Sequence, residues 1–280
     1  MIKKKANKMV EAIIMAGTNK RRPVKGEACK ALIDYNGKPL VQPVIDAHLE
    51  SAYVEKVYVV GPRNRFLKTL PGYIDLVTFV DEAKDRDDEG NGFAANLMKG
   101  LKARTSTYPY VHFSTCDIPR INSWSVERFI SDARCLVEQN LERGIIVDYI
   151  QALVKLEEDL KFFKGFTKKH RSAVRFNDGD YRLSNFAYAH VGNMLQHAEA
   201  IRSSYNLRKG KETPIKTAVK VFGFWNLVKL SPMGNIFGKI SRDEFIRYIA
   251  KRNGISIDIV VGAADIAADI DNDDEFEALK

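Results

Sequence analysis

The first 140 residues alternate between short apolar runs and longer segments with a helical spacing of apolar positions. Apolar runs of about four to eight residues between turn signals are typical of strands buried on both faces of a parallel sheet. The expected strands cover residues 12–15, 54–60, 76–80 and 110–116, and the expected helices cover residues 39–51, 92–104 and 123–139. This alternation predicts an α/β fold with a Rossmann-like, doubly wound sheet that is mixed but mostly parallel.

The second half of the chain shows three further patterns. Residues 174–191 alternate apolar and polar positions around an Asp-Gly pair at 178–179, which predicts a β-hairpin. Ser241 with Glu244 three residues later is a capping-box pattern, which predicts the start of a helix. Residues 257–262 (IDIVVG) predict one more buried strand near the C-terminus.

A basic loop with a glycine at its start follows the first expected strand. Gly17 lacks a Cβ, so the backbone there can turn sharply and approach a ligand closely. Residues 20–30 hold five cations and one acid, Glu27. The cations are Lys20, Arg21, Arg22, Lys25 and Lys30. A triphosphate of about four negative charges needs cations and free backbone N–H groups, so this loop indicates a polyphosphate site. A solvated basic loop is the alternative.

Two acidic segments each follow an apolar run. Asp117 comes directly after the strand expected at 110–116, and Asp271 lies in the acidic segment beyond the strand at 257–262. Ligands of open α/β sheets bind outside the carboxyl ends of strands, so we expect Asp117 in the same crevice as Gly17. Carboxylates from two strand ends suit Mg²⁺, which takes oxygen ligands and bridges substrate phosphates. A helix cap or a helix N-terminus is the structural alternative for each segment.

Taken in order, these segments resemble the MobA-like nucleotidyltransferases of the nucleotide-diphospho-sugar transferase superfamily. The motifs that carry the resemblance are AIIMAG at 12–17, KALIDYNGKPLVQPVIDAHLES at 30–51, VEKVYVVG at 54–61, FAANLMKGL at 93–101, FSTCDIP at 113–119 and ADIDNDDEFEAL at 268–279. They span nearly the whole chain, and residues 140–250 match least. The resemblance implies an enzyme that uses Mg²⁺ to transfer a nucleoside monophosphate from an NTP to a small phosphorylated acceptor, such as a sugar phosphate or a cofactor precursor, with release of pyrophosphate.

The resemblance also implies roles for particular residues. The nucleotide-binding residues would be Met15, Ala16, Gly17, Thr18 and Asn96, the catalytic residues on the phosphates Lys30 with Arg21 or Arg22, and the metal ligands Asp117 and Asp271. Residues 18–21 stand where the family usually has a second glycine and then an arginine, which leaves open which arginine grips the phosphates. Glycines at 90 and 92 precede Asn96 and favour backbone contact with the base, with an ordinary exposed loop as the alternative.

We expect one nucleotidyltransferase domain over residues 1–280. Within it, residues 1–140 form the nucleotide-binding half, 141–250 an acceptor-side and helical insertion, and 251–280 the C-terminal strand and metal-binding segment. In the resembled family, the hairpin region covers the active site and meets the acceptor.

Two segments of the expected insertion have more than one interpretation. Basic residues between 161 and 171 either bind the phosphate of the acceptor or form a solvated helix face. They are Lys161, Lys164, Lys168, Lys169, His170 and Arg171. Residues 216–230 (KTAVKVFGFWNLVKL) are rich in aromatic residues and would rest on a membrane surface, pack in the core or form a homodimer face.

Two other functions stay open. A glycosyltransferase with the same sheet architecture would use a nucleotide-sugar donor. It normally carries a D-x-D motif at the metal strand, which residues 116–119 (CDIP) lack. A non-catalytic nucleotide sensor is favoured by the altered glycine loop.

Composition agrees with an enzyme of small anionic substrates. The chain of 280 residues is 45% hydrophobic, enough for a substantial core, and its net charge of +8 attracts anions. No zinc spacing or RNA-binding signature is present, so nucleic acid is not an expected partner. The three cysteines lie apart from any C-x-x-C pattern, which suits a reducing cytosol, and Cys116 is interpreted as small buried filler. The sequence has no apolar stretch of about 18 residues and no signal-peptide pattern, so we expect a cytoplasmic protein without a transmembrane segment.

Overall fold

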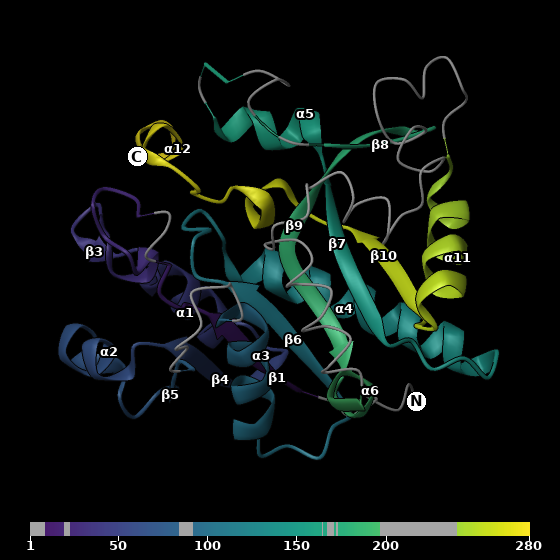
Figure 1. Cartoon of the computed structure of the whole chain (residues 1–280), viewed down its shortest axis with the longest axis horizontal. Helices are drawn as coiled ribbons and strands as arrows, with labels where there is room; N and C mark the ends of the chain where they lie inside the picture. The colour runs from purple at the N-terminus through teal and green to yellow at the C-terminus, as the bar shows by residue number, and fades with distance from the viewer. Residues whose placement is uncertain are drawn as a thin grey trace, which may run out of the picture.

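The computed structural model describes residues 9–19, 23–83, 92–163, 165–166, 171, 173–196 and 240–280, and Figure 1 shows the arrangement of its elements. The strands are β1 (Val10–Met15), β2 (Asp34–Tyr35), β3 (Lys38–Pro39), β4 (Val54–Gly61), β5 (Thr78–Asp81), β6 (Tyr110–Thr115), β7 (Tyr149–Lys155), β8 (Val174–Phe176), β9 (Gly179–His190) and β10 (Ile257–Val261). The helices are α1 (Gln42–Leu49), α2 (Arg63–Thr69), α3 (Gly92–Ala103), α4 (Ser123–Glu142), α5 (Leu156–Asp159), α6 (Val191–Gln196), α11 (Arg242–Asn253) and α12 (Asp273–Leu279). Short 3-10 helices are η1 (Lys30–Leu32), η2 (Pro71–Tyr73), η3 (Leu160–Phe162) and η4 (Ala264–Ala267).

An eight-stranded mixed sheet forms the centre of the molecule, with strand order β10-β7-β9-β6-β1-β4-β5 and β8 paired to β9. Strands β1, β4, β5 and β6 pair in parallel, and so do β7 and β10. Strand β9 runs antiparallel to its neighbours β6 and β7. All strands of the path except β9 therefore point the same way, and their carboxyl ends share the upper edge of the sheet in Figure 1. The predicted mixed, mostly parallel α/β fold is confirmed.

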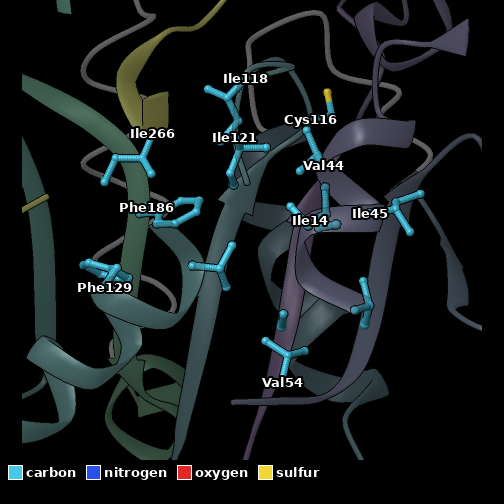
Figure 2. Close-up of a cluster of buried hydrophobic side chains, with 14 of the residues drawn as sticks. Ile14, Val44, Ile45, Val54, Cys116, Ile118, Ile121, Phe129, Phe186 and Ile266 are labelled. Carbon is cyan, nitrogen blue, oxygen red and sulfur yellow. The ribbon is translucent and has the colours of Figure 1, made fainter. Parts of the chain in front are cut away.

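Strand β1 shows how the sheet is covered on both faces. Its successive side chains point to opposite faces. Ala12 and Ile14 enter a core shared with α1 and α4, whereas Ile13 and Met15 enter a second core shared with α3 and α6. Figure 2 shows the first core, whose members include Ile14 of β1 and Val44 of α1. Burial of an aliphatic side chain is worth about 1.5–3 kcal/mol, so the apolar run that predicted this strand also holds the layers together.

The elements expected from the sequence are present. The expected strands correspond to β1, β4, β5, β6 and β10, and the expected helices of the first half to α1, α3 and α4. The hairpin forms from β8 and β9. Ser241 caps α11 through the expected capping box, because its hydroxyl accepts from the Glu244 N–H and the Glu244 carboxylate accepts from the Ser241 N–H. Among the described elements, no helix is long and apolar enough to span a bilayer.

Strand β7 lies between β9 and β10, yet no sequence pattern predicted it. Gln151 interrupts its apolar run, and its pairing with β9 shifts register between Gln151 and Leu153. The Gln151 side-chain amide donates to the carbonyl oxygens of Ser184 and Phe186 at 3.0 and 3.1 Å. It therefore satisfies backbone groups that the irregular ladder leaves unpaired. A polar residue with this role hides a buried strand from a search for apolar runs.

The segment after β10 crosses the carboxyl edge of the sheet and ends in α12 beside β3 (Figure 1). Its apolar residues Ile270, Phe276 and Leu279 pack with Tyr35 and Leu40. The Tyr35 hydroxyl also donates to the Leu279 carbonyl oxygen at 2.6 Å. This packing brings the C-terminal acidic segment to the loop that follows β1.

Candidate functional site

Two strand ends meet at the centre of the carboxyl edge. Met15 at the end of β1 lies opposite Thr115 at the end of β6, and the Cys116 N–H donates to the Met15 carbonyl oxygen at 3.1 Å. The Cys116 side chain is buried in the core, as predicted. Gly17 and Asp117 each follow two residues after this pair. The glycine turn and the first acidic segment therefore leave neighbouring strands at the same edge.

Lys30 of η1 lies at this edge. Its Nζ donates to Asp117 Oδ2 at 3.1 Å, to Asp271 Oδ1 at 2.8 Å and to the Ile270 carbonyl oxygen at 2.7 Å. Only 14% of the Lys30 side chain is exposed. Burial works to lower the pKa of this ammonium group, but the two facing carboxylates outweigh burial and raise the pKa. The group is therefore charged at neutral pH.

The two carboxylates on Lys30 differ in exposure and in pKa. The Asp117 side chain is as buried as that of Lys30, and burial raises its pKa although the ammonium group opposes the shift. Its Oδ1 accepts from the Thr115 hydroxyl at 2.6 Å. The Asp271 side chain is 56% exposed, and there Lys30 outweighs burial and lowers the pKa. The site thus combines one carboxylate set within the fold with one that faces solvent.

Asp117 and Asp271 are the residues that could hold a divalent metal. Mg²⁺ prefers oxygen ligands and is commonly bound by one or two carboxylates together with substrate phosphates. These two side chains offer that donor set. Within the described ranges, no group of three or more His, Cys, Asp or Glu side chains forms a metal site. Two carboxylates would leave the other coordination positions of such an ion to water or to a further ligand.

The residues expected to contact a nucleotide differ in what they expose. The side chains of Met15 and Ala16 are buried, so only their backbone is left to face a ligand. A Cβ on Gly17 would lie 2.5 Å from Asn96 Nδ2, closer than real contacts allow, so a larger residue here would force the Asn96 side chain to shift. The structure therefore packs Asn96 of α3 against the turn after β1. Gly90, expected near the base, lies outside the described residues.

Glu82 belongs to the same turn, and no sequence pattern singled it out. Its carboxylate accepts from the Thr18 N–H at 2.7 Å and from the Thr18 hydroxyl at 2.8 Å. Its carbonyl oxygen accepts from Lys99 at 2.9 Å. The Asn96 side-chain oxygen accepts from the next N–H, that of Ala83, at 2.6 Å. Glu82 directly follows β5, so the strand-end rule applied to the acid after β6 was the signal that could have found it.

The cations of the basic loop do not all reach the site. Arg21 and Arg22 lie outside the described residues. The Lys25 N–H donates to the Asp273 carboxylate at 2.7 Å, and its ammonium group pairs with Glu277 at 2.5 Å. Lys25 therefore ties the loop to α12 in this structure and is not bound to the two carboxylates on Lys30.

Arg171 contradicts both interpretations of the basic stretch at 161–171. Its side chain is fully buried and pairs with Asp159, Asp269 and Glu275 at 3.1, 2.8 and 2.6 Å. It is neither a solvated residue nor free to hold a phosphate. A buried guanidinium is tolerated when carboxylates compensate its charge, and two of these three partners come from the distant C-terminal segment. The sequence pattern around the arginine could not show that.

Of the other residues considered in the expected insertion, the structure describes Lys161 and leaves the rest outside the described ranges. Lys161 is exposed and pairs with Glu158 at 2.5 Å, as on a solvated helix face. The basic residues at 164 and 168–170 and the aromatic segment at 216–230 lie outside the described residues. The expected division of the chain into three parts stays a prediction.

Several solved structures share the fold of this chain. A hypothetical transferase from Thermus thermophilus aligns with a TM-score of 0.72 and 22% identity, over 97% of this chain and all (100%) of that one. CMP:2-keto-3-deoxy-manno-octonic acid synthetase complexed with CTP aligns with a TM-score of 0.56 and 13% identity, over 94% and 93% of the two chains. 4-Diphosphocytidyl-2C-methyl-D-erythritol synthase from Anaerococcus prevotii aligns at 0.52 and 12%, over 97% and 94%. The fold is therefore of the nucleotide-diphospho-sugar transferase type.

Residues 12–149 match the family model of the MobA-like NTP transferase domain. The model covers just under half of the chain, and it confirms the resemblance to the MobA-like nucleotidyltransferases found in the sequence. The molybdenum cofactor guanylyltransferase of Vibrio parahaemolyticus is 33% identical over 117 residues, which is 42% of this chain and 53% of that protein. The chain thus matches about half the length of this relative. Asp271 lies beyond the matched family range.

Proposed function

We propose that the protein is a Mg²⁺-dependent nucleotidyltransferase, which moves a nucleoside monophosphate from an NTP to a small phosphorylated acceptor and releases pyrophosphate. The observation that carries the proposal is the buried Lys30 ammonium group between Asp117 and Asp271, at the strand ends beside the glycine turn. The family model that matches residues 12–149 supports the reaction class. The guanylyltransferase relative makes GTP one of the donors to test.

The reaction asks little covalent chemistry of the protein. An oxygen of the acceptor phosphate attacks the α-phosphorus, the bond from that phosphorus to the α–β bridging oxygen breaks, and pyrophosphate leaves with the electron pair. The acceptor phosphate is already ionised at neutral pH, so no general base is needed. Catalysis then consists of positioning the two substrates and neutralising their charge.

Lys30 is the residue we assign to the transferred phosphoryl group. Its position at the strand ends and its raised pKa supply a fixed positive charge where negative charge develops. Arg21 or Arg22 would add a second cation from the basic loop. Asp117 and Asp271 would hold Mg²⁺, which neutralises phosphate charge when bound.

The turn after β1 is assigned to the nucleoside. Because Gly17 has no side chain, the backbone there can approach the base or ribose closely, with Asn96 packed behind it. Glu82 holds both donors of Thr18 and so fixes the shape of the turn. The buried positions of Met15 and Ala16 leave backbone contact as their contribution.

The test is thermal stabilisation by each of the four NTPs, with and without Mg²⁺, followed by a pyrophosphate-release assay with sugar phosphates as acceptors. We expect one NTP to stabilise the protein in the presence of Mg²⁺, by about 2.7 kcal/mol at a hundred times its Kd. Asp117→Asn should abolish both the stabilisation and turnover. Asp46→Asn is the matched control, because Asp46 lies on α1 and accepts from the Tyr73 hydroxyl, away from the site.

The other outcomes separate the rival functions. Normal turnover by Asp117→Asn would sink the metal assignment. Stabilisation by a nucleotide-sugar and by no NTP would support a glycosyltransferase. Tight NTP binding without pyrophosphate release, whichever acceptor is supplied, would identify a nucleotide sensor.

A further inference from the structure

Arg171 is the largest fully buried side chain among the described residues. All three nitrogens of its guanidinium donate hydrogen bonds. Nε and Nη2 donate to the Asp159 carboxylate at 3.1 and 3.2 Å, and Nη2 also donates to Asp269 Oδ1 and the Ala267 carbonyl oxygen, both at 2.8 Å. Nη1 donates to Glu275 Oε1 at 2.6 Å. Three carboxylates and the backbone of the C-terminal segment thus converge on one side chain.

A buried ion cluster of this kind is weak evidence for stability in itself, because desolvation of the charges offsets their attraction. Its geometry is more informative. The Arg171 guanidinium lies 3.9 Å from the centre of the Phe163 ring. The Phe163 ring covers one face of the guanidinium, and the carboxylates accept from the nitrogens along the edge of the guanidinium. Together they leave this planar group a single orientation. A guanidinium fixed in this way can hold its partners in fixed positions too.

Glu275 links this cluster to the candidate active site. Its Oε1 accepts from Arg171, and its Oε2 accepts from the backbone N–H of Asp271 at 2.6 Å. The carboxylate of that same residue accepts from Lys30, as does the carbonyl oxygen of Ile270. One continuous path of hydrogen bonds therefore runs from the buried guanidinium to the ammonium group at the strand ends.

The path acts on a segment that has no regular structure of its own. Residues 268–272 belong to neither a helix nor a strand. The more than half-exposed Asp271 side chain depends on its backbone for its position. Side chains behind a ligand orient it, and their loss typically weakens metal binding about 10–100-fold.

We propose that Arg171 is a positioning residue, which acts through Glu275 to fix the backbone amide of Asp271 and so sets the Asp271 carboxylate against Lys30. The assignment of a ligand to the Asp271 carboxylate rests on the proposed function. The placement itself does not, because it concerns contacts within this chain.

The first experiment compares two buried arginines changed in the same way. Arg171→Lys leaves one nitrogen where three donated, so contact with Glu275 is lost or loosened. Arg104→Lys is the control, because Arg104 pairs with Glu11 at 2.6 Å and its side chain is only 4% exposed. The readout is hydrogen exchange of the Asp271 amide in the ligand-free proteins. We expect exchange at least about tenfold faster than in the wild type for the first variant, because the amide's hydrogen bond to a charged group is lost or loosened, and little change for the control.

Glu275→Gln provides a second variant of unchanged shape. Its single carbonyl oxygen can accept from Arg171 or from the Asp271 N–H, but not from both. We expect the same faster exchange at Asp271. In the presence of the stabilising NTP, both variants should also need about tenfold more Mg²⁺ than the wild type for half-maximal thermal stabilisation.

Two results would overturn the inference. One is an Asp271 amide that exchanges no faster in Arg171→Lys and Glu275→Gln than in Arg104→Lys. The other is faster exchange with an unchanged Mg²⁺ requirement, which would remove the link from position to binding. A wild-type protein that responds to no NTP would contradict the proposed function instead, and the exchange comparison would still decide whether Arg171 positions the segment.

Discussion

Two buried carboxylate clusters lie at opposite ends of β1, and they differ in how completely their acids are satisfied. Glu11, near the amino end, accepts from the Tyr58 hydroxyl, the Thr105 N–H and hydroxyl and the Ser106 N–H through Oε1, and from Arg104 through Oε2. Burial works to raise the pKa of Glu11, but these donors together lower it. Five donors thus make this carboxylate stable as an ion.

Asp117, beyond the carboxyl end of the neighbouring strand, shows the opposite balance. The Thr115 hydroxyl and the Lys30 ammonium group are its side-chain donors, and burial raises its pKa. An additional cation would stabilise this ion, whereas five donors already stabilise the Glu11 ion. Burial and charge are common to both clusters, so the number of donors is what separates a structural carboxylate from a candidate ligand.

The largest expected effect tests the structural side of this comparison. Glu11→Gln keeps the shape of the side chain but leaves Arg104 without its counter-ion. Removal of one partner of a buried pair typically costs about 3–5 kcal/mol, so we expect a loss of that size in the free energy of unfolding measured with urea. NTP binding to the folded fraction should not change. A loss below about 1 kcal/mol would show that the cluster is not structural.

The second-largest expected effect tests the carboxylate at the candidate active site, Asp117. Lys30→Met removes the charge assigned to the transferred phosphoryl group, and we expect turnover to fall about 10²–10³-fold. It also leaves the two carboxylates of Asp117 and Asp271 without an ammonium group between them. Mg²⁺ alone should therefore raise the melting temperature of the variant more than that of the wild type. Lys38→Met, at an exposed position on β3, should behave as the wild type in both measurements.

The contrast between the two ends also shows what a sequence can reveal. Asp117 and Lys30 could be singled out because each stands next to a local signal, a strand end or a glycine loop. Arg171 could not, because its partners Asp269 and Glu275 are 98 and 104 residues away in the chain. Local patterns record which element a residue belongs to, whereas compensation of a buried charge depends on tertiary contacts.

The same limit explains the elements that were missed. Strand β7 was hidden because Gln151 satisfies the backbone groups at its irregular pairing, and periodicity counts that residue only as polar. Glu82 was missed because the strand-end rule was applied to the acid after β6 and not to the one after β5, and its contact with Thr18 is a tertiary one. The sheet could therefore be predicted well, and the contacts across its carboxyl edge could not.

A third buried cluster sharpens the comparison because it has no opposite charge. The Nε2 atoms of His48 and His112 lie 3.2 Å apart, and both rings are fully buried. Burial lowers the pKa of His48 from 6.5 to about 4, and that of His112 well below its usual value. Between pH 6.5 and about 4, the unfolded chain therefore binds protons more readily than the folded chain. The free energy of unfolding falls as the pH falls through that window.

For His48 alone, the loss between pH 7 and pH 5 is about 2 kcal/mol. Urea denaturation at the two pH values measures it. His48→Leu should remove the part of this loss that comes from His48, while the buried His112 should keep its own part. Equal stability of the wild type at both pH values would mean that the histidines are protonated in the folded state.

The smallest effect concerns one hydroxyl. Thr115→Val removes a donor from Asp117 and preserves the size of a side chain at the end of β6. The carboxylate then loses the hydroxyl that orients it, which should weaken its hold on a cation. We expect the Mg²⁺ requirement for NTP-dependent stabilisation to rise about tenfold, at the lower end of the effect of outer ligand contacts. An unchanged requirement would show that the Thr115 hydroxyl does not orient this carboxylate, and its placement would then have to rest on Lys30 alone.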